Sequence, residues 1–342
     1  MAGFEHMKVV ILGCGSIGQR HARNLRELGI TDLLLVDSQI ERAASVAREL
    51  DAKAFDVTVK AYEEKPEIAL ICVPTSMHLR LTQEALQNNC HLFIEKPLSD
   101  SMEGVLPFVR AAEARERVML VGYNFRFDPI VNQVQEWLSQ RKIGRITSAR
   151  FHFGSYLPWR HPWEDYRLGY GARREMGGGA ILDAVHELDM ALLLFGKPDV
   201  IYCAGGKYSD LEMDAEDLAE ILMSYPDKIV SVHLDYIERP AARRCEIIGT
   251  QGRIEADLFG RTAKYFDGEK RDWTECDNCG TLEESYKWEM RHLLDCVAGK
   301  AKPIVDGRTG AESLLLAEQA KASMQTGLPI MARDAALAAG AK

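Results

Sequence analysis

The stretch that decides the fold is residues 8–37, KVVILGCGSIGQRHARNLRELGITDLLLVD. An apolar run lies within residues 6–12 and is typical of a buried parallel strand. A glycine-rich turn follows, and residues 16–28 carry apolar side chains at helical spacing up to Gly29, which can end a helix. A second apolar run, residues 32–36, ends at Asp37. This order of strand, turn, helix and strand predicts a parallel α/β unit.

The glycines of this turn have the spacing G-x-G-x-x-G. In such a turn the first glycine permits a tight bend, the second lets backbone approach a pyrophosphate, and the third lets helix and strand pack closely. The amino end of the following helix adds a favourable field for phosphate charge. We therefore predict that a dinucleotide is bound by Gly13, Gly15, Ser16, Ile17 and Gly18.

Asp37 lies about 20 residues beyond the glycines, where an acidic side chain can accept hydrogen bonds from both ribose hydroxyls. This position favours NAD over NADP. Asp37 could instead cap the helix expected from Ile40. Arg42, about one turn into that helix, would admit a 2′-phosphate if it turned toward the ribose. We expect NAD to be the cofactor, bound with Asp37 and Arg42, and NADP is the alternative.

Length and composition indicate a folded protein of two domains. We place a dinucleotide-binding domain in residues 1–122 and a second domain in 123–342. Hydrophobic residues make up 46% and charged residues 27% of the chain, and no apolar run approaches the ~20 residues that span a bilayer. A formal charge of −9 argues against nucleic acid as a partner. The first residues show no signal or transit pattern, so we expect a cytoplasmic location without a membrane role.

The eight cysteines are predicted to be reduced thiols, because no secretion signal accompanies them. Cys276 and Cys279 have the spacing of half a zinc site, but no second pair follows at suitable spacing. A surface turn is the better explanation of this spacing. We therefore predict no metal site.

The rest of the chain supports an α/β domain followed by an α+β domain. Strands near residue 54 and at 68–73, 91–95 and 118–121 alternate with helices at 40–50, 77–88 and from Ser99 or Asp100 to Arg115, which indicates a doubly wound parallel sheet. Beyond Gly122 the strands follow one another with short turns, as in a large, mainly antiparallel open sheet. These strands are expected at 146–153, 200–207, 218–224, 229–236, 243–248, 253–256 and 262–266, and the helices at 130–139, 180–195, 282–298 and 309–326. One face of such a sheet can bury against another subunit, so we expect a homodimer or homotetramer.

Motifs along both domains resemble those of the Gfo/Idh/MocA family, the glucose-fructose oxidoreductase and inositol dehydrogenase group. The resemblance covers nearly the whole chain. It rests on the glycine turn, Val73-Pro74-Thr75 with His78, Glu95-Lys96-Pro97, residues 122–127 (GYNFRF) with Pro129, and residues 177–183 (GGGAILD) followed by His186.

The resemblance implies a Rossmann domain and an NAD(P)-dependent oxidoreductase that acts on a sugar, a nucleotide-sugar or a cyclitol. It also implies further cofactor contacts from Val73, Pro74, Thr75, His78, Glu95, Lys96 and Asn124. Tyr123 and Arg126 would lie at the substrate, although Arg126 could form only a structural ion pair. Trp163, Tyr166 and Arg173 would stack on a sugar face and bind an anionic group, or would form an ordinary loop core.

Oxidation of a secondary alcohol needs a hydride acceptor, a group that takes the hydroxyl proton, and positive charge near the oxygen. Lys96 follows a strand at the edge where ligands bind, so its ammonium can contact the reacting oxygen; otherwise it is a surface partner of Glu95. His186 titrates near neutrality and is the candidate proton carrier, unless it is a buried histidine with a satisfied ring.

Asp183 is the third candidate catalytic residue. The family commonly spaces the aspartate and histidine by four residues, whereas Asp183 and His186 are three apart, which still places both on one face of a helix. Asp183 could orient His186 or substrate hydroxyls, or could simply cap the helix, and Glu187 could orient His186 instead. The glycines at 177–179 would let backbone pass close to cofactor or sugar, or would form a flexible loop.

The leading functional hypothesis is a reversible sugar or polyol dehydrogenase. A non-catalytic NAD-binding sensor with the same fold is a second hypothesis, which the presence of both Lys96 and His186 argues against. Zinc-assisted dehydrogenation is a third, and the incomplete cysteine set disfavours it.

Overall fold

The computed structural model describes residues 4 and 6–332 of the chain. The chain forms two compact units. Of the described residues, the first unit contains those up to 124 together with 286–312, and the second contains 125–285 together with 313–332. The chain therefore passes between the units three times. The division predicted from the sequence lies at 122/123, and the structure adds a late segment to the first unit.

The first unit holds a six-stranded parallel sheet with the order β3-β2-β1-β4-β5-β6. Its strands are β1 (Lys8–Leu12), β2 (Asp32–Val36), β3 (Lys53–Phe55), β4 (Ile68–Ile71), β5 (His91–Glu95) and β6 (Met119–Gly122). Its helices before residue 124 are α1 (Ser16–Glu27), α2 (Ile40–Leu50), α3 (Thr58–Glu63), α4 (His78–Gln87) and α5 (Val105–Ala114). The strand order reverses at β1 and β4, as in a doubly wound sheet.

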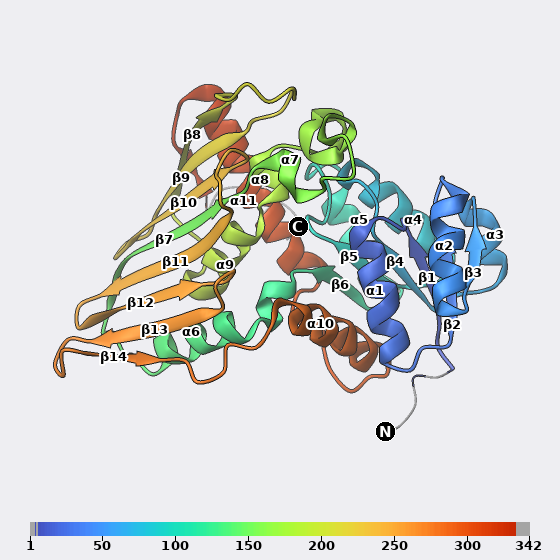
Figure 1. Cartoon of the computed structure of the whole chain (residues 1–342), viewed down its shortest axis with the longest axis horizontal. Coiled ribbons are helices and arrows are strands. Elements are labelled where there is room, and N and C mark those ends of the chain that lie inside the picture. The colour runs from blue at the N-terminus through green and yellow to red at the C-terminus, as the bar shows by residue number, and fades with distance from the viewer. Residues whose placement is uncertain (1–3, 5, 333–342) are drawn as a thin grey trace. The chain divides into compact units, whose positions relative to one another are not determined.

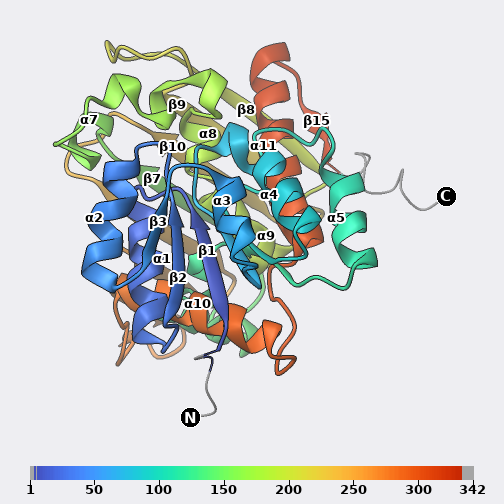
Figure 2. The same cartoon turned by 90° about the vertical axis from the view of Figure 1, so that its right-hand side faces the viewer.

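The strands of this sheet are apolar without alternation because helices cover both faces. All residues of β4 and β6 are buried, as are four of the five in β1, β2 and β5. Figure 2 shows α1 and α2 on one side of β1–β3, and α3 and α4 on the other. The predicted doubly wound α/β architecture is confirmed.

Most of α10 (Leu282–Val297) and the start of α11 (Gly307–Thr326) also belong to the first unit. Val305 lies in the loop between these two helices, and its carbonyl accepts a hydrogen bond from the backbone N–H of Val121 in β6 at 2.9 Å. A Cβ atom at Gly307 would overlap the sulfur of Met119, and one at Gly310 would crowd Val121. The late segment therefore packs tightly on β6.

The second unit holds a nine-stranded sheet with the order β14-β13-β12-β11-β7-β10-β9-β8-β15. All neighbours are antiparallel except β7 and β10, which are parallel. The strands are β7 (Ile146–Gly154), β8 (Val200–Gly206), β9 (Leu218–Ser224), β10 (Ile229–Asp235), β11 (Ala242–Gly249), β12 (Gly252–Asp257), β13 (Thr262–Asp267), β14 (Asp272–Glu275) and β15 (Ile330–Met331). The predicted large, mainly antiparallel sheet is confirmed, and β14 and β15 are additional to it.

Helices pack on one face of this sheet. Helix α9 (His186–Phe195) contacts β7 and β10, and α6 (Pro129–Ser139) contacts β12 and β13; α8 (Ala180–Asp183) and the one-turn α7 (Leu157–Arg160) lie nearby in Figure 1. On β7 the side chains of Ala149, Phe151 and Phe153 are buried, whereas Arg150 is exposed and His152 is half-buried. This alternation is expected of a sheet with one covered face.

Two predicted helices differ from the structure. Helix α5 begins after Gly104, not at Ser99 or Asp100, because Gly104 has a φ of 73° and its backbone cannot continue a right-handed helix. Ser99 instead donates its hydroxyl to Asp100. The helix predicted over 180–195 is broken at Ala184, where the backbone leaves helical geometry, so α8 and α9 are separate. Among the described residues, no helix combines the length and apolar character needed to cross a bilayer.

Candidate active site

The glycine turn joins the carboxyl end of β1 to the start of α1, and its three glycines have different surroundings. Gly13 has a φ of 93°, and a Cβ there would collide with the backbone of Cys72. A Cβ at Gly18 would collide with the carbonyl of Gly13. Gly15 has an ordinary φ of −68°, and within the described structure a Cβ there would meet no atom within 4 Å. The fold therefore requires Gly13 and Gly18, whereas the space above Gly15 is open to a ligand.

Asp37 follows β2 and lies at the same edge of the sheet, with 7% of its surface exposed. Its Oδ2 accepts the backbone N–H of Cys14 at 2.9 Å, and its Oδ1 accepts that of Gln39 at 2.9 Å. Arg42 in α2 places its Nη1 3.6 Å from Oδ2 of Asp37. The carboxylate is thus fixed against the glycine turn, and the guanidinium of Arg42 lies beside it.

Lys96 directly follows β5, and its backbone is tied to the preceding glutamate. Glu95 accepts the Lys96 backbone N–H at Oε2 (3.2 Å), and its Oε1 lies 2.7 Å from Nε2 of the buried His21 in α1. The structure therefore buries Glu95 against His21 instead of leaving it on the surface. The side chain of Lys96 is itself half-buried.

Glu289, on α10, completes a fully buried group with His21 and Glu95. One ligand-type atom of each side chain lies within 4.8 Å of the others. Burial, reinforced by the negative charge of Glu95, raises the pKa of Glu289 well above its usual range. Both effects favour the protonated form of Glu289, which limits the negative charge within the group.

The segment after β4 also reaches this edge, and His78 anchors it. Nδ1 of His78 lies 2.8 Å from the carbonyl of Pro97, and Nε2 lies 2.9 Å from that of Val73. Burial lowers the pKa of His78. Thr75 is buried and Pro74 is half-buried. His78 thus links the two loops that the sequence predicts at the cofactor.

Tyr123 and Asn124 follow β6 and are buried, with exposed fractions of 0% and 1%. The predicted cofactor residues of the first unit thus follow its parallel strands, on the edge where doubly wound sheets bind ligands. Their contacts with a cofactor or substrate remain predictions.

In the second unit, His186 is the first residue of α9 and is buried, with its ring 4.7 Å from that of Phe125 in an edge-on arrangement. The neighbouring Glu187 is completely buried, and its Oε1 lies 2.8 Å from Nε of Arg243. Glu187 therefore belongs to a buried ion pair, which gives it a role apart from the predicted support of His186.

Asp183 ends α8, so the prediction that Asp183 and His186 share one helical face is wrong. The break lies where the Asp183 carboxylate is held by side chains from outside the helix. Oδ2 accepts hydrogen bonds from Arg160 and from the Tyr236 hydroxyl (3.0 Å), and Oδ1 accepts one from the Tyr170 hydroxyl (2.6 Å). The Arg160 guanidinium also stacks 4.6 Å from the Tyr236 ring.

The glycines at 177–179 are explained by contacts within the second unit. A Cβ at Gly178 would collide with backbone carbonyls of residues 170–173, and one at Gly179 would overlap the carboxylate of Glu216. Gly177 and Gly179 also have positive φ values of 81° and 108°. Left-handed backbone and close approach of the protein's own atoms are therefore sufficient to require glycine here.

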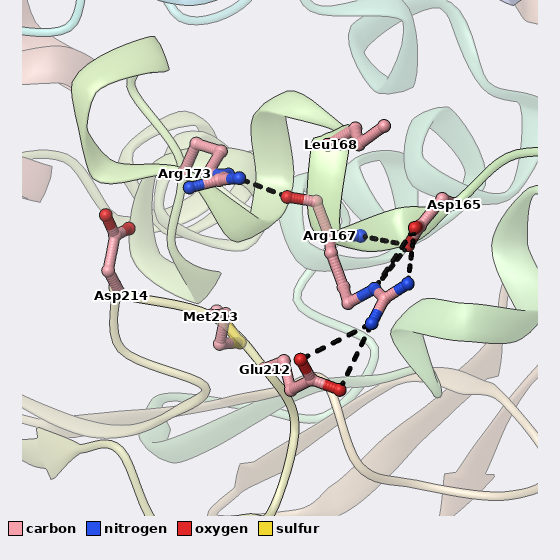
Figure 3. Close-up of a pocket in the computed structure, with 7 residues that line it drawn as sticks. All are labelled: Asp165, Arg167, Leu168, Arg173, Glu212, Met213 and Asp214. Carbon is pink, nitrogen blue, oxygen red and sulfur yellow. Dashed lines mark hydrogen bonds and ion pairs between the residues drawn. The ribbon is translucent and has the colours of Figure 1, made fainter.

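Arg173 lines a pocket of about 420 Å³ within the second unit (Figure 3). Its Nε donates to the carbonyl of Arg167 at 2.7 Å, and Arg167 itself is paired with Asp165 and Glu212. The hydroxyl of Tyr166 accepts the backbone N–H of Glu212 at 3.0 Å. The complete lining is Asp165, Arg167, Leu168, Arg173, Glu212, Met213 and Asp214.

Two other predicted substrate residues lie elsewhere. Trp163 is 72% exposed, so it is not part of a loop core. Arg126 forms a two-pronged ion pair with Asp189 in α9, with distances of 2.9 and 2.8 Å, and Asp189 also accepts the hydroxyl of Ser313. The structural role considered for Arg126 is therefore present, and its contact with substrate remains a prediction.

Four residues of these networks were not predicted from the sequence: His21, Glu289, Arg160 and Tyr236. A signal existed for His21, because it lies on the buried face of α1 with Gly18, Ala22 and Leu25. The others become visible only through contacts between segments far apart in the sequence.

Two family models match the chain. The NAD-binding Rossmann model of the Gfo/Idh/MocA oxidoreductase family matches residues 7–123, and its C-terminal alpha/beta domain model matches 135–331. A levoglucosan dehydrogenase solved with NADH and levoglucosan superposes with a TM-score of 0.86 over 96% of this chain and all of its own, at 18% identity. That structure shares the fold.

Similar curated proteins include dehydrogenases of cyclitols and nucleotide sugars. Myo-inositol 2-dehydrogenase of Thermotoga maritima is 26% identical, with 93% of this chain and 96% of the relative aligned. UDP-N-acetylglucosamine 3-dehydrogenase of Acidithiobacillus ferrooxidans is also 26% identical, with 94% and 98% aligned. Since the two family models together match most of its length, this chain belongs to the NAD-binding Gfo/Idh/MocA oxidoreductase family.

Proposed function

We propose that this protein is an NAD(P)-dependent dehydrogenase that oxidises a secondary hydroxyl of a sugar, nucleotide sugar or cyclitol, or reduces the corresponding ketone. The observation that carries the proposal is the edge of the parallel sheet in the first unit. The open space above Gly15, the fixed carboxylate of Asp37 and the backbone-anchored Lys96 follow β1, β2 and β5 there. The dehydrogenases among the relatives support the substrate class.

The residues present fit a dinucleotide. The turn at Gly13–Gly18 leaves room for a pyrophosphate at the start of α1, and Asp37 offers a carboxylate to ribose hydroxyls. A bound nicotinamide would accept or return the hydride. We propose NAD as the preferred cofactor because Asp37 would accept its ribose hydroxyls. Arg42, beside Asp37, is the group that would contact the 2′-phosphate if NADP were bound.

In the proposed reaction, the ammonium of Lys96 donates a hydrogen bond to the reacting oxygen and stabilises its developing negative charge. The imidazole of His186 accepts the hydroxyl proton in oxidation and returns it in reduction. Asp183, held by Arg160 and two tyrosine hydroxyls, is proposed to fix the segment that precedes His186.

The test is steady-state turnover of the Lys96→Ala variant, followed by NADH absorbance with myo-inositol, scyllo-inositol, UDP-N-acetylglucosamine and levoglucosan. Because Lys96 is proposed to act mainly in the transition state, kcat should fall about 100-fold or more, with NADH affinity much less changed. Lys60→Ala, which removes an exposed lysine of α3, is the matched control and should leave kcat unchanged. Wild-type turnover retained by Lys96→Ala would exclude this role for Lys96.

A further inference from the structure

The outer face of the nine-stranded sheet carries a compact group of two histidines and two carboxylates. Because β7 and β10 are parallel and in register, His152 lies beside His233 and Gly154 lies beside Asp235. The two imidazole rings stack at 4.6 Å with an angle of 11° between their planes. Asp235 and Glu238 complete the group at the ends of these strands.

The polar atoms of the group converge on a small volume. Ligand-type atoms of His152, His233 and Asp235 all lie within 4.8 Å of one another. Nε2 of His233 is 2.9 Å from Oδ2 of Asp235, and Nε2 of His152 is 2.5 Å from Oε2 of Glu238. A Cβ at Gly154 would overlap both carboxylate oxygens. The missing side chain of Gly154 therefore makes the space into which both acids point.

Two of the inward-facing atoms, on His233 and Asp235, are oriented by partners on the far side of the same side chain. Nδ1 of His233 lies 2.6 Å from Oε1 of Glu220 on β9, which leaves Nε2 to face the group. Oδ1 of Asp235 accepts the backbone N–H groups of Ile237 and Glu238 at 2.6 and 2.7 Å, which leaves Oδ2 to face it. A carboxylate on the second nitrogen of a histidine and hydrogen bonds to a carboxylate are the usual supports of metal ligands.

The charges around the group also favour a cation. Glu220, Asp235 and Glu238 supply three carboxylates. Arg244 on β11 is the register partner of His152, but its Nε lies 3.5 Å from Oδ2 of Asp257, so its charge is paired with that carboxylate. The side chains of His152 and His233 are 37% and 25% exposed, so an ion in solution can reach them.

We propose that His152, His233, Asp235 and Glu238 form a binding site for a divalent transition-metal ion such as Zn²⁺. Two imidazole nitrogens and two carboxylate oxygens are a ligand set that suits tetrahedral zinc. This site contradicts the absence of metal predicted from the cysteines, and it carries no short ligand motif because its two histidines lie on strands far apart in the chain. The proposal is independent of the dehydrogenase activity.

The test uses the untagged full-length chain, stripped with a chelator and titrated with Zn²⁺ by calorimetry. One ion should bind per chain, and Co²⁺ in its place should give the strong visible absorption of a tetrahedral site. His152→Ala and His233→Ala should each abolish this stoichiometric binding. Glu220→Gln, which removes only an orienting group, should weaken binding about 10-fold to 100-fold.

His161→Ala, which removes an exposed histidine of the same unit, is the matched control and should bind Zn²⁺ like the wild type. Circular dichroism checks that each variant is folded. If an alanine variant does not fold, His152→Gln and Glu238→Gln are used to remove ligands of the site instead. A wild-type chain that binds no Zn²⁺ would overturn the proposal. Binding that persists in the double variant His152→Ala/His233→Ala, or that disappears in Cys276→Ser, would overturn it as well.

Discussion

The cofactor edge of the first unit and the Asp183–His186 segment of the second unit are built in opposite ways. At the first, the glycine turn, Asp37 and Lys96 each directly follow a strand, and backbone N–H groups donate to the carboxylates of Asp37 and Glu95 there. At the second, Asp183 is fixed by Arg160, Tyr170 and Tyr236 from separate segments. A local motif can be recognised in the sequence, whereas a site made of distant partners cannot.

The Asp183 network should show the largest effect on stability. Arg160→Met keeps most of the packing but leaves the buried Asp183 carboxylate without its cation, so the unfolding free energy should fall by about 3 kcal/mol. Arg167→Ala breaks the exposed pair with Asp165, and it should lower the unfolding free energy much less because solvent screens this pair. Urea unfolding measures both, and equal losses would contradict a special role for the buried pair.

The glycine turn allows a matched pair of substitutions that separates folding from binding. Gly18→Ala should lower the unfolding free energy by about 1–3 kcal/mol, because its Cβ collides with the carbonyl of Gly13. Gly15→Ala should change stability by no more than about 0.5 kcal/mol and yet weaken NADH binding. Thermal unfolding and fluorescence titration with NADH measure the two effects. An unchanged NADH affinity in Gly15→Ala would show that no ligand approaches there.

The cofactor preference depends on Asp37. Asp37→Ala removes the carboxylate proposed to accept the ribose hydroxyls, so the preference for NADH over NADPH should narrow by about tenfold. Arg42→Ala is the companion variant and should weaken NADPH more than NADH. The dissociation constants of both cofactors are the measurement. An unchanged ratio of the NADH and NADPH dissociation constants in Asp37→Ala would show that Asp37 only holds the glycine turn through Cys14 and does not bind the ribose.

The effect expected at the buried acid Glu289 is on the pH dependence of stability, and not on stability at a single pH. Its pKa is higher in the folded chain than in the unfolded chain, so the folded state holds a proton that the unfolded state releases. Its contribution to stability is full below the unfolded-state value of about 4.3 and declines by about 1.4 kcal/mol per pH unit until the folded-state pKa is passed. Glu289→Gln should remove this decline, and urea unfolding at about pH 5 and about pH 8 tests it. Equal slopes in both proteins would show that Glu289 does not titrate in this range.

Much of the fold was predictable because its signals are local. The bounds of β2, α2, β5 and β9 match the apolar runs and helical spacing of the sequence. The start of α5 was not predictable, since Ser99 and Asp100 offer good capping side chains while the left-handed backbone of Gly104 decides the outcome.

The candidate site was predictable only in part. Residues at strand ends were found, whereas the break between Asp183 and His186 was not, because helical spacing continues across it. The partners of Arg126 and Glu187 were not found either, since Asp189 and Arg243 carry no motif that links them. Side-chain pairing across a fold depends on tertiary contacts, which periodicity does not report.

The late segment on β6 has a consequence for biosynthesis. Val305, Gly307 and Gly310 are synthesised only after residues 125–285. The first sheet therefore leaves the ribosome before the segment that covers its edge strand β6 exists. A nascent chain in this state exposes unpaired strand and apolar surface, the features that promote misassembly. The sheet formed by residues up to 124 can therefore complete its packing only after residues 286–312 have been made.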